Sequence, residues 1–236
     1  MRAVAKMAGL LALVLAISAC GGTHHHDDGE AVTHRLGSDW FGAGSALNVT
    51  DPIAGDAFLA GGEVSTAAEV QGDLAVAGGD VSIGGAIGDD LYAAGGGVRL
   101  DAIVTGNARL AGGYVAVGPA TEVRGALTLA GGRVRFDGTA HGYLHATGGS
   151  VLIDGTVDGD AEVRADEVEL GPNTRIAGKL TVHSPTRPVV PEGAEIAGGV
   201  DYHMADSRVH VHGGYDRVVY DLRDVTYGIG SVLWIL

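Results

Sequence analysis

Apolar and polar residues alternate along most of the chain, and the alternation restarts at a nearly constant interval. The clearest copy runs from Gly72 to Gly88. Its apolar positions are Leu74, Val76, Val81, Ile83 and Ile87, with mostly small or polar residues between them. A period of two is typical of a strand with one buried face. Each copy is therefore predicted to hold three short strands separated by corners.

The repeat is written eight times between residues 55 and 198, with nine starting positions. They are Gly55, Gly72, Asp89, Gly106, Gly125, Gly142, Gly159, Gly178 and Gly198, and successive starts lie 17, 17, 17, 19, 17, 17, 19 and 20 residues apart. A unit this short cannot bury its own apolar face, so neighbouring units must stack and share a core. We therefore expect an all-β, three-sided β-helix of about eight turns of 17–20 residues, over residues 49–203.

A glycine pair recurs at one position of the repeat, where we expect a corner. The pairs are Gly61-Gly62, Gly78-Gly79, Gly95-Gly96, Gly112-Gly113, Gly131-Gly132 and Gly148-Gly149. Glycine is favoured where the backbone needs a positive φ, and we expect that need here. A second corner carries the two-residue insertions of the longer turns, at Gly118-Pro119 and Gly171-Pro172. The pair is lost at Ala165-Asp166 and Ser184-Pro185, which indicates that the stack is ending there.

The composition favours a narrow solenoid and excludes some functions. Of the residues, 46% are hydrophobic but only 5% are aromatic, and 41 are glycine, which predicts a thin aliphatic core and argues against helical bundles. The formal net charge of -14 argues against a nucleic-acid partner, because phosphate binding needs clustered Lys and Arg. A single cysteine excludes a disulfide within the chain.

The first 20 residues have the features of an export signal. Arg2 and Lys6 supply positive charge, an apolar run covers residues 7–17, and a cysteine follows two small residues. Ile17-Ser18-Ala19-Cys20 resembles the lipobox of bacterial lipoproteins. The resemblance implies removal of residues 1–19 and lipidation of Cys20, and Gly21 after the cysteine implies the periplasmic side of the outer membrane. The alternative, an uncleaved membrane anchor, needs a run of roughly 20 residues.

Residues 20–48 are polar and glycine-rich, and we expect a flexible tether. Within them, residues 24–28 read His-His-His-Asp-Asp, which could ligate zinc or nickel or could be a solvated spacer. We favour the spacer and expect no metal site. Val49 and Ile53 are expected to belong to an incomplete first coil.

Acidic residues recur at the start of the repeats. Asp56, Asp73, Asp90 and Asp160, with Asn107 in the same place, could form a calcium ladder or simply stabilise a turn. Calcium-binding rolls carry Gly-Gly-x-Gly-x-Asp in every half-turn, whereas here the acid occurs once per turn and is replaced by Ala126, Tyr143 and Lys179. A turn-forming role is therefore predicted.

Residues 204–236 are expected to form a C-terminal tail outside the repeats. Residues 208–212 read Arg-Val-His-Val-His, which predicts a strand with both histidines on one face, near His203. No third metal ligand is set by the spacing, so we expect an exposed strand. The apolar residues 229–236 are predicted either to dock on the rod or to touch lipid, being too few to span a bilayer.

The repeat sequence Gly-Asp-Leu-x-x-Ala-Gly-Gly-x-Val-x-Ile resembles the bactofilins, the polymer-forming cytoskeletal proteins of bacteria, over residues 55 to about 200. The resemblance implies a right-handed triangular β-helix that assembles end to end into filaments without nucleotide and serves as a scaffold. This chain departs from them in two respects: bactofilins are typically cytoplasmic, whereas this chain is expected to be exported and lipidated, and its long C-terminal tail could block an end that filaments require.

Two other functional classes were weighed against a scaffold. An enzyme is disfavoured: the steps are not multiples of the six residues found in left-handed acyltransferases, and His141 and His145 fit outward-facing positions without a nucleophile. A surface adhesin or binding module with a flat exposed face stays open. We therefore expect a non-enzymatic envelope scaffold that is lipid-anchored, self-associates, and has no cofactor and no small-molecule substrate.

Overall fold

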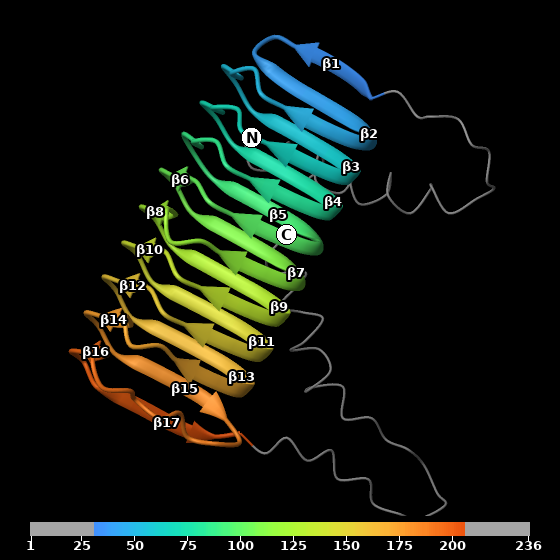
Figure 1. Cartoon of the computed structure of the whole chain (residues 1–236). Coiled ribbons are helices and arrows are strands. Elements are labelled where there is room, and N and C mark those ends of the chain that lie inside the picture. The colour runs from blue at the N-terminus through green and yellow to red at the C-terminus, as the bar shows by residue number, and fades with distance from the viewer. Residues whose placement is uncertain (1–30, 206–236) are drawn as a thin grey trace, which may run out of the picture.

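The computed structural model describes residues 31–205, and this part of the chain is a β-solenoid without a helix (Figure 1). An 11-stranded sheet has the order β1-β2-β3-β4-β5-β7-β9-β11-β13-β15-β17, and every pairing in it is parallel except that of β1 with β2. Leaving out β1, ten coils are stacked. The predicted all-β solenoid is confirmed, and the described part contains no helix long and apolar enough to cross a membrane.

The strands of this sheet are β1 (Val32–Leu36), β2 (Asp39–Val49), β3 (Ala57–Thr66), β4 (Leu74–Ile83), β5 (Leu91–Leu100), β7 (Ala108–Val117), β9 (Leu127–Phe136), β11 (Leu144–Ile153), β13 (Ala161–Leu170), β15 (Leu180–Ser184) and β17 (Val200–Met204). The second sheet consists of β6 (Ile103–Val104), β8 (Glu122–Val123), β10 (Thr139–Ala140), β12 (Thr156–Val157), β14 (Arg175–Ile176) and β16 (Glu195–Ile196). Isolated parallel bridges among Ile53, Val70, Ile87 and Val104 continue this second sheet toward the N-terminal coils.

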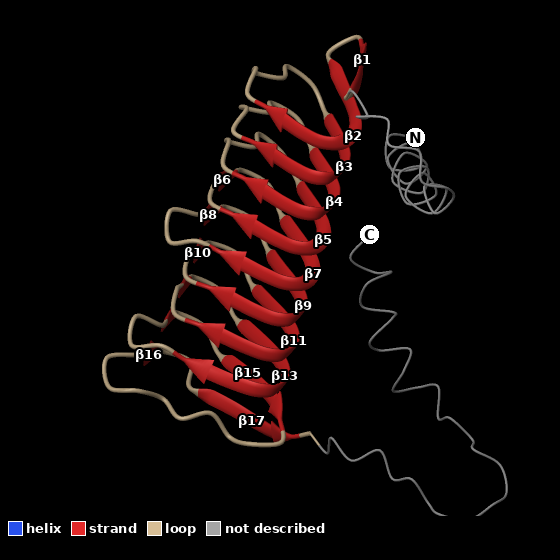
Figure 2. Ribbon diagram, turned by 45° about the vertical axis from the view of Figure 1, so that its right-hand side comes forward, coloured by secondary structure: helices blue, strands red, loops and turns tan. Residues whose placement is uncertain are grey.

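Each coil has three sides. The bend between the first two lies where the alternation of inward and outward side chains shifts by one residue. In β4, Leu74 and Val76 point inward before Gly78-Gly79, and Val81 and Ile83 point inward after it. Because the inward positions shift by one residue at the glycines, the strand bends there without breaking. We call the outer surface of the first half of the long strands face 1, that of the second half face 2, and that of the short strands face 3 (Figure 2).

The core is a column of aliphatic side chains that runs the length of the stack. Parallel pairing places like residues over one another, as where Val64, Val81 and Val98 occupy consecutive coils. The largest fully buried side chain is Phe136, which lies in register with Val117 and Ile153. In-register burial of this kind joins each repeat only to its neighbours, as the short period requires.

The expected reason for the glycine pairs is wrong. Among the described residues, positive φ occurs only at Gly37, Gly193 and Gly199, none of which belongs to the six corner pairs named above. The pairs instead lie where coils approach closely: a Cβ on Gly95 would stand 2.9 Å from the carbonyl oxygen of Gly78 in the preceding coil. Glycine is therefore required at these positions because the stacked backbones leave no room for a Cβ.

The first coil begins earlier than the sequence analysis expected. Residues 32–48 were assigned to a flexible tether, but they form β1 and most of β2. Trp40 packs against the core and Leu47 is buried, in register with Ala57 and Val64 of β3. The sequence analysis missed this copy for two reasons. Trp40 stands where the other repeats have an aliphatic residue, and the copy does not begin with glycine. With β2 at one end and β17 at the other, the eight predicted repeats become ten coils.

The two ends of the stack differ. At the N-terminal end, β1 turns back at Gly37, whose φ is +66, and pairs with β2 from Val32↔Ala43 to Leu36↔Asp39. At the C-terminal end, β15 stops at Ser184, and an irregular segment with three prolines replaces the second half of the strand. The loss of the glycine pair at Ser184-Pro185 thus shortens the strand but does not end the stack, because β13 runs unbroken through Ala165-Asp166 and β17 adds a further coil after β15. Residues 206–236, including the predicted strand 208–212, lie outside the described residues.

Candidate functional surfaces

The recurring acidic residues form a hydrogen-bonded column along one edge of face 1. Each accepts, through Oδ1, the backbone N–H of the equivalent residue in the next coil. The links run from Asp56 N to Asp39 (3.1 Å), Asp73 N to Asp56 (2.9 Å), Asp90 N to Asp73 (3.0 Å), Asn107 N to Asp90 (2.8 Å) and Ala126 N to Asn107 (3.0 Å). We call Asp39, Asp56, Asp73, Asp90 and Asn107 the aspartate column. Asp39 extends it one coil beyond the predicted members.

This geometry supports the predicted role in the turn over calcium binding. Oδ1 of each acid is used by a backbone donor at a corner that no strand pairing reaches. Across the described residues, no three His, Cys, Asp or Glu side chains are grouped so that they could hold a metal ion. Asp160 acts in the same way lower in the stack, where it accepts the Lys179 N–H at 2.8 Å.

A cation and an aromatic ring, those of Arg109 and Tyr92, contact Asp90 of the aspartate column. Arg109 lies 4.0 Å from Asp90 Oδ2 and 5.3 Å from the Tyr92 ring centroid, and its guanidinium also donates to the Tyr92 hydroxyl. Burial and the Asp90 charge raise the pKa of Tyr92. The phenol therefore stays protonated and can donate to Asp90 Oδ2, at 3.3 Å. This arrangement offsets the repulsion between stacked carboxylates.

Face 3 carries a histidine held between two carboxylates. His141 Nδ1 lies 2.6 Å from Asp158 Oδ2, and Nε2 lies 3.3 Å from Glu122 Oε1. The hydrogen bond with Asp158, followed by that with Glu122, raises the pKa of His141. Glu122, His141 and Asp158 come from three consecutive coils, so they are spaced by 19 and 17 residues. An alignment of the repeats could have placed them together, but sequence reasoning missed the cluster.

The chemistry of this cluster is limited by its own hydrogen bonds. A protonated imidazole donates to both carboxylates and so is an ion-pair bridge. A catalytic histidine of the nucleophile-activating kind needs one nitrogen facing a hydroxyl or thiol. Here both nitrogens face carboxylates, and the ring is 41% exposed. The cluster therefore fits a structural bridge between coils, and His141 and His145 lie at the outward positions expected for them.

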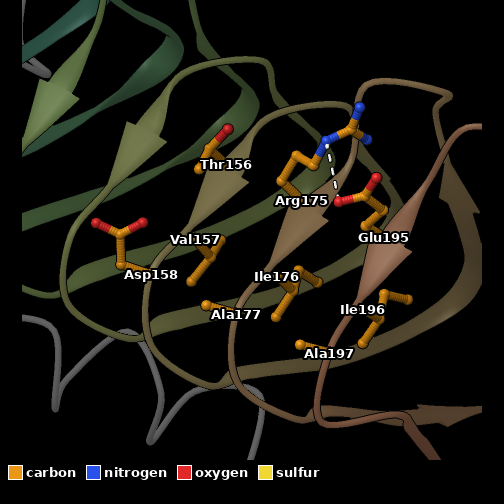
Figure 3. Close-up of a pocket in the computed structure, with 9 residues that line it drawn as sticks. All are labelled: Thr156, Val157, Asp158, Arg175, Ile176, Ala177, Glu195, Ile196 and Ala197. Atoms are coloured by element: carbon orange, nitrogen blue, oxygen red, sulfur yellow. Dashed lines mark ion pairs between the residues drawn. The ribbon is translucent and has the colours of Figure 1, made fainter.

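A shallow depression lies lower on face 3, over β12, β14 and β16 (Figure 3). It is lined by Thr156, Val157, Asp158, Arg175, Ile176, Ala177, Glu195, Ile196 and Ala197. Arg124, His141 and Asp158 occupy the same repeat position in three successive coils. In the next two coils this position holds the small residues Ala177 and Ala197, which leaves the depression. Arg175 points toward Glu195, with Nε 3.7 Å from Oε2, and also donates to the Gly193 and Thr174 carbonyls. Its cation is thus already paired.

The lower part of face 1 is charged. The rings of His183 and His203 stack at 4.9 Å between centroids, with Glu162 3.7 Å from His183 Nε2. Partial burial, followed by the nearby Arg164 cation, lowers the pKa of His183. Lys179 donates to Asp201 at 3.1 Å, and this hydrogen bond lowers the pKa of that carboxyl.

The upper part of face 1 is mostly apolar, with His34 of β1 opposite Phe41 at its end. Phe41 is 37% exposed and its ring stacks on that of Phe58 at 5.0 Å between centroids, with 9° between the ring planes. Next to them runs a column of alanines. We define the apolar patch as Val32, Phe41, Phe58, Ala60, Ala77 and Ala94.

Face 2 has a basic band between two acidic ones. Arg99, Arg133 and Arg135 lie on the middle coils, with Glu63 and Asp80 above and Glu167 and Glu169 below. Arg99 lies 5.9 Å from the Tyr114 ring centroid, and Arg135 pairs with Asp137. This band is a local exception to the net negative charge.

The predicted lipidation residue Cys20 lies outside the described residues, as do the histidines at 24–26. No family model matches the chain, and neither does any curated protein or solved structure that was compared with it.

Proposed function

We propose that this chain is a non-enzymatic scaffold of the bacterial cell envelope that associates end to end. One observation carries the proposal: ten coils form an uninterrupted stack that leaves a backbone edge at each end. Strand edges with unpaired N–H and C=O groups are the usual route by which sheets join. The surfaces described above supply ion pairs between coils and no assembled reaction centre.

The two ends are suited to association in different degrees. All five residues of β1 are exposed, and its outer edge has no strand beside it among the described residues. β17 forms the opposite edge and carries the exposed Met204, at 77%. The β17 edge presents a parallel strand, as each coil does, and so is the better site for another copy, whereas the antiparallel β1 covers the first coil and makes that end the weaker contact.

The resemblance of the repeat to the bactofilins supports the same function. The resemblance implies end-to-end assembly into filaments without a nucleotide. A stack of in-register coils is compatible with such assembly. The net charge of -14 opposes side-by-side packing of rods, and salt weakens that repulsion. End-to-end contacts should therefore persist at low salt, whereas lateral sheets should need salt or divalent cations.

The assembly is tested by electron microscopy and light scattering on residues 21–236, over a range of salt and protein concentration. A second form ending at Ala205 keeps β17 and removes the tail. Filaments in either form support the scaffold, and filaments in the shorter form alone mean that the tail covers the C-terminal edge. Strictly monomeric behaviour of both forms rejects the scaffold and favours the alternative, a binding module that presents a flat face.

The proposed location depends on Cys20. The charged N-terminus, the apolar run and Ile17-Ser18-Ala19-Cys20 support lipidation of its sulfur and attachment to the periplasmic side of the outer membrane. Labelled palmitate should enter the wild-type protein and not Cys20→Ser. Equal labelling of the two would overturn the anchor while leaving the scaffold proposal intact.

A further inference from the structure

The apolar patch joins two exposed side chains, Val32 and Phe41, to four half-buried ones on neighbouring strands. It covers face 1 from β1 to β5, and Val32, which is 71% exposed, lies beside Ala43 on the same surface. Below it the same face carries Arg109, His145, Glu162 and His183. An apolar area concentrated at one end of a face is a candidate docking surface for a small segment.

The shape of the patch excludes one class of occupant. Because Phe41 and Phe58 stack face to face along the rod, they present ring edges to the outside and not ring faces. A sugar that binds by stacking needs an exposed ring face. The alanines beside the rings leave a flat surface that suits aliphatic and aromatic side chains.

The charges around the patch exclude another class. The aspartate column borders one long side of it, and Glu63 and Asp80 of face 2 lie beyond the other. These carboxylates repel an anionic lipid surface. The occupant that fits is an apolar segment without acidic side chains.

The size of the patch favours a short segment over a second copy. Four strand spacings of about 4.8 Å and a width of two to four residues, at about 3.3 Å each, give an area of about 130 to 250 Å². Each partner of a stable dimer buries roughly 800 Å². A segment tethered to the same chain needs no such area, because its local concentration is high.

We propose that residues 229–236 of this chain, Ile-Gly-Ser-Val-Leu-Trp-Ile-Leu, pack on the apolar patch. They contain no charged side chain. The residues before them carry Asp216, Arg217, Asp221, Arg223 and Asp224. Polar and then apolar residues thus follow one another along residues 206–236 in the same order as along face 1 from β17 toward β2.

The distance permits this packing. From β17 to β3 there are eight coil spacings, or about 38 Å at about 4.8 Å each. The 23 residues from 206 to 228 can span at most about 76 Å. The chain also leaves the stack from β17, a strand of face 1 itself.

Trp234 reports on the packing. The chain has two tryptophans, Trp40 and Trp234, so Trp40→Phe leaves Trp234 as the only one. In residues 21–236, which keep every described residue, we expect a blue-shifted Trp234 emission and acrylamide quenching severalfold weaker than that of the free peptide 229–236. Phe41→Ser with Phe58→Ser should raise the quenching to the level of the peptide.

Two further variants separate docking from misfolding. Ile103→Ser changes an apolar side chain of face 3 that is 44% exposed, and it should leave Trp234 protected. Val232→Ser with Ile235→Ser cannot disturb the coils, and it should release Trp234 as the patch variant does. Circular dichroism melting confirms that the coils are intact in each variant.

Several outcomes overturn the proposal. Trp234 quenched like the free peptide in the parent, or unaffected by the patch variant, rejects docking on the patch. Protection that appears only as concentration rises assigns the patch to a second copy. Protection that requires added phosphatidylglycerol vesicles assigns residues 229–236 to lipid. None of these results depends on whether the rods form filaments.

Discussion

At the scale of single residues, the structure is governed by contacts that repeat once per coil. A glycine pair leaves space for the backbone of the preceding coil, and an aspartate accepts a backbone N–H of the next coil. A histidine links the carboxylates on either side of it. Each contact joins residues 17 or 19 positions apart, so each acts between neighbouring coils and can be tested by a single substitution.

Substituting Gly95 tests the role of the glycine pairs. The new Cβ of Gly95→Val would lie 2.9 Å from the Gly78 carbonyl oxygen and 3.3 Å from Val81 Cγ2. We expect a loss of about 1 to 3 kcal/mol in the free energy of unfolding, as for overpacked sites. Gly84→Val is the control, because a Cβ there meets only the Thr66 carbonyl oxygen, at 3.8 Å. Equal melting shifts for the two variants would contradict the close-approach explanation.

Substituting Asp73 tests the aspartate column. Asp73→Ala removes the acceptor of the Asp90 N–H, and we expect it to cost about 1 to 3 kcal/mol in unfolding free energy. Asp73→Asn keeps a carbonyl acceptor, as Asn107 does, and should cost much less. Calcium and EDTA should leave the melting temperature of the parent unchanged. A calcium-dependent rise that Asp73→Asn abolishes would show that the column is an ion site.

The His141 bridge predicts a pH dependence. Its pKa is raised above the unfolded value of 6.5, so its contribution to stability is present in full below pH 6.5 and is lost as the pH rises through the raised pKa. The destabilisation by His141→Gln should therefore be larger below pH 6.5 than well above it. NMR titration should show the pKa of His141 falling toward 6.5 in Asp158→Asn. An unshifted titration would mean that the Asp158 contact is not formed in solution.

At the scale of elements, the eight long strands share one design, β15 and β17 keep only its first half, and β1 differs from all of them. β1 is antiparallel, short and fully exposed, so it contributes little buried area. Its place over β2 is that of an edge cover, which keeps the first coil from presenting a parallel edge. The irregular segment after β15 occupies the opposite end, where three prolines interrupt the second half of the coil.

Removing β1 tests the edge cover. A chain that begins at Ser38 should melt close to the parent, because β1 buries little surface, and should form larger species in analytical ultracentrifugation. The control is a chain that begins at Ala31, which keeps β1 and lacks the preceding residues. A large drop in the melting temperature would mean that β1 stabilises the coils, and unchanged sedimentation would mean that it does not guard the edge.

At the scale of the whole molecule, three flat faces carry different surfaces. Face 1 is apolar toward β2 and charged toward β17, face 2 has a basic band, and face 3 carries the His141 cluster and the depression beside Arg175. The net charge of -14 keeps such rods apart at low salt and leaves the ends as the favoured contacts. The proposed functions of the ends and of the apolar patch follow from this division.

The sequence alone determined the all-β solenoid, its three sides and the register of eight coils, because a repeat of alternating residues records the period, the buried face and the corners together. It also identified the aspartate column as part of the turn. The coil formed by β2 could not be predicted, since Trp40 and the absent glycine start break the repeat and only contact with Ala57 and Val64 shows its place. The reason for the glycine pairs, the antiparallel β1 and the apolar patch were decided by the tertiary structure. Each depends on which atoms of neighbouring coils meet, and spacing along the chain does not contain that distance.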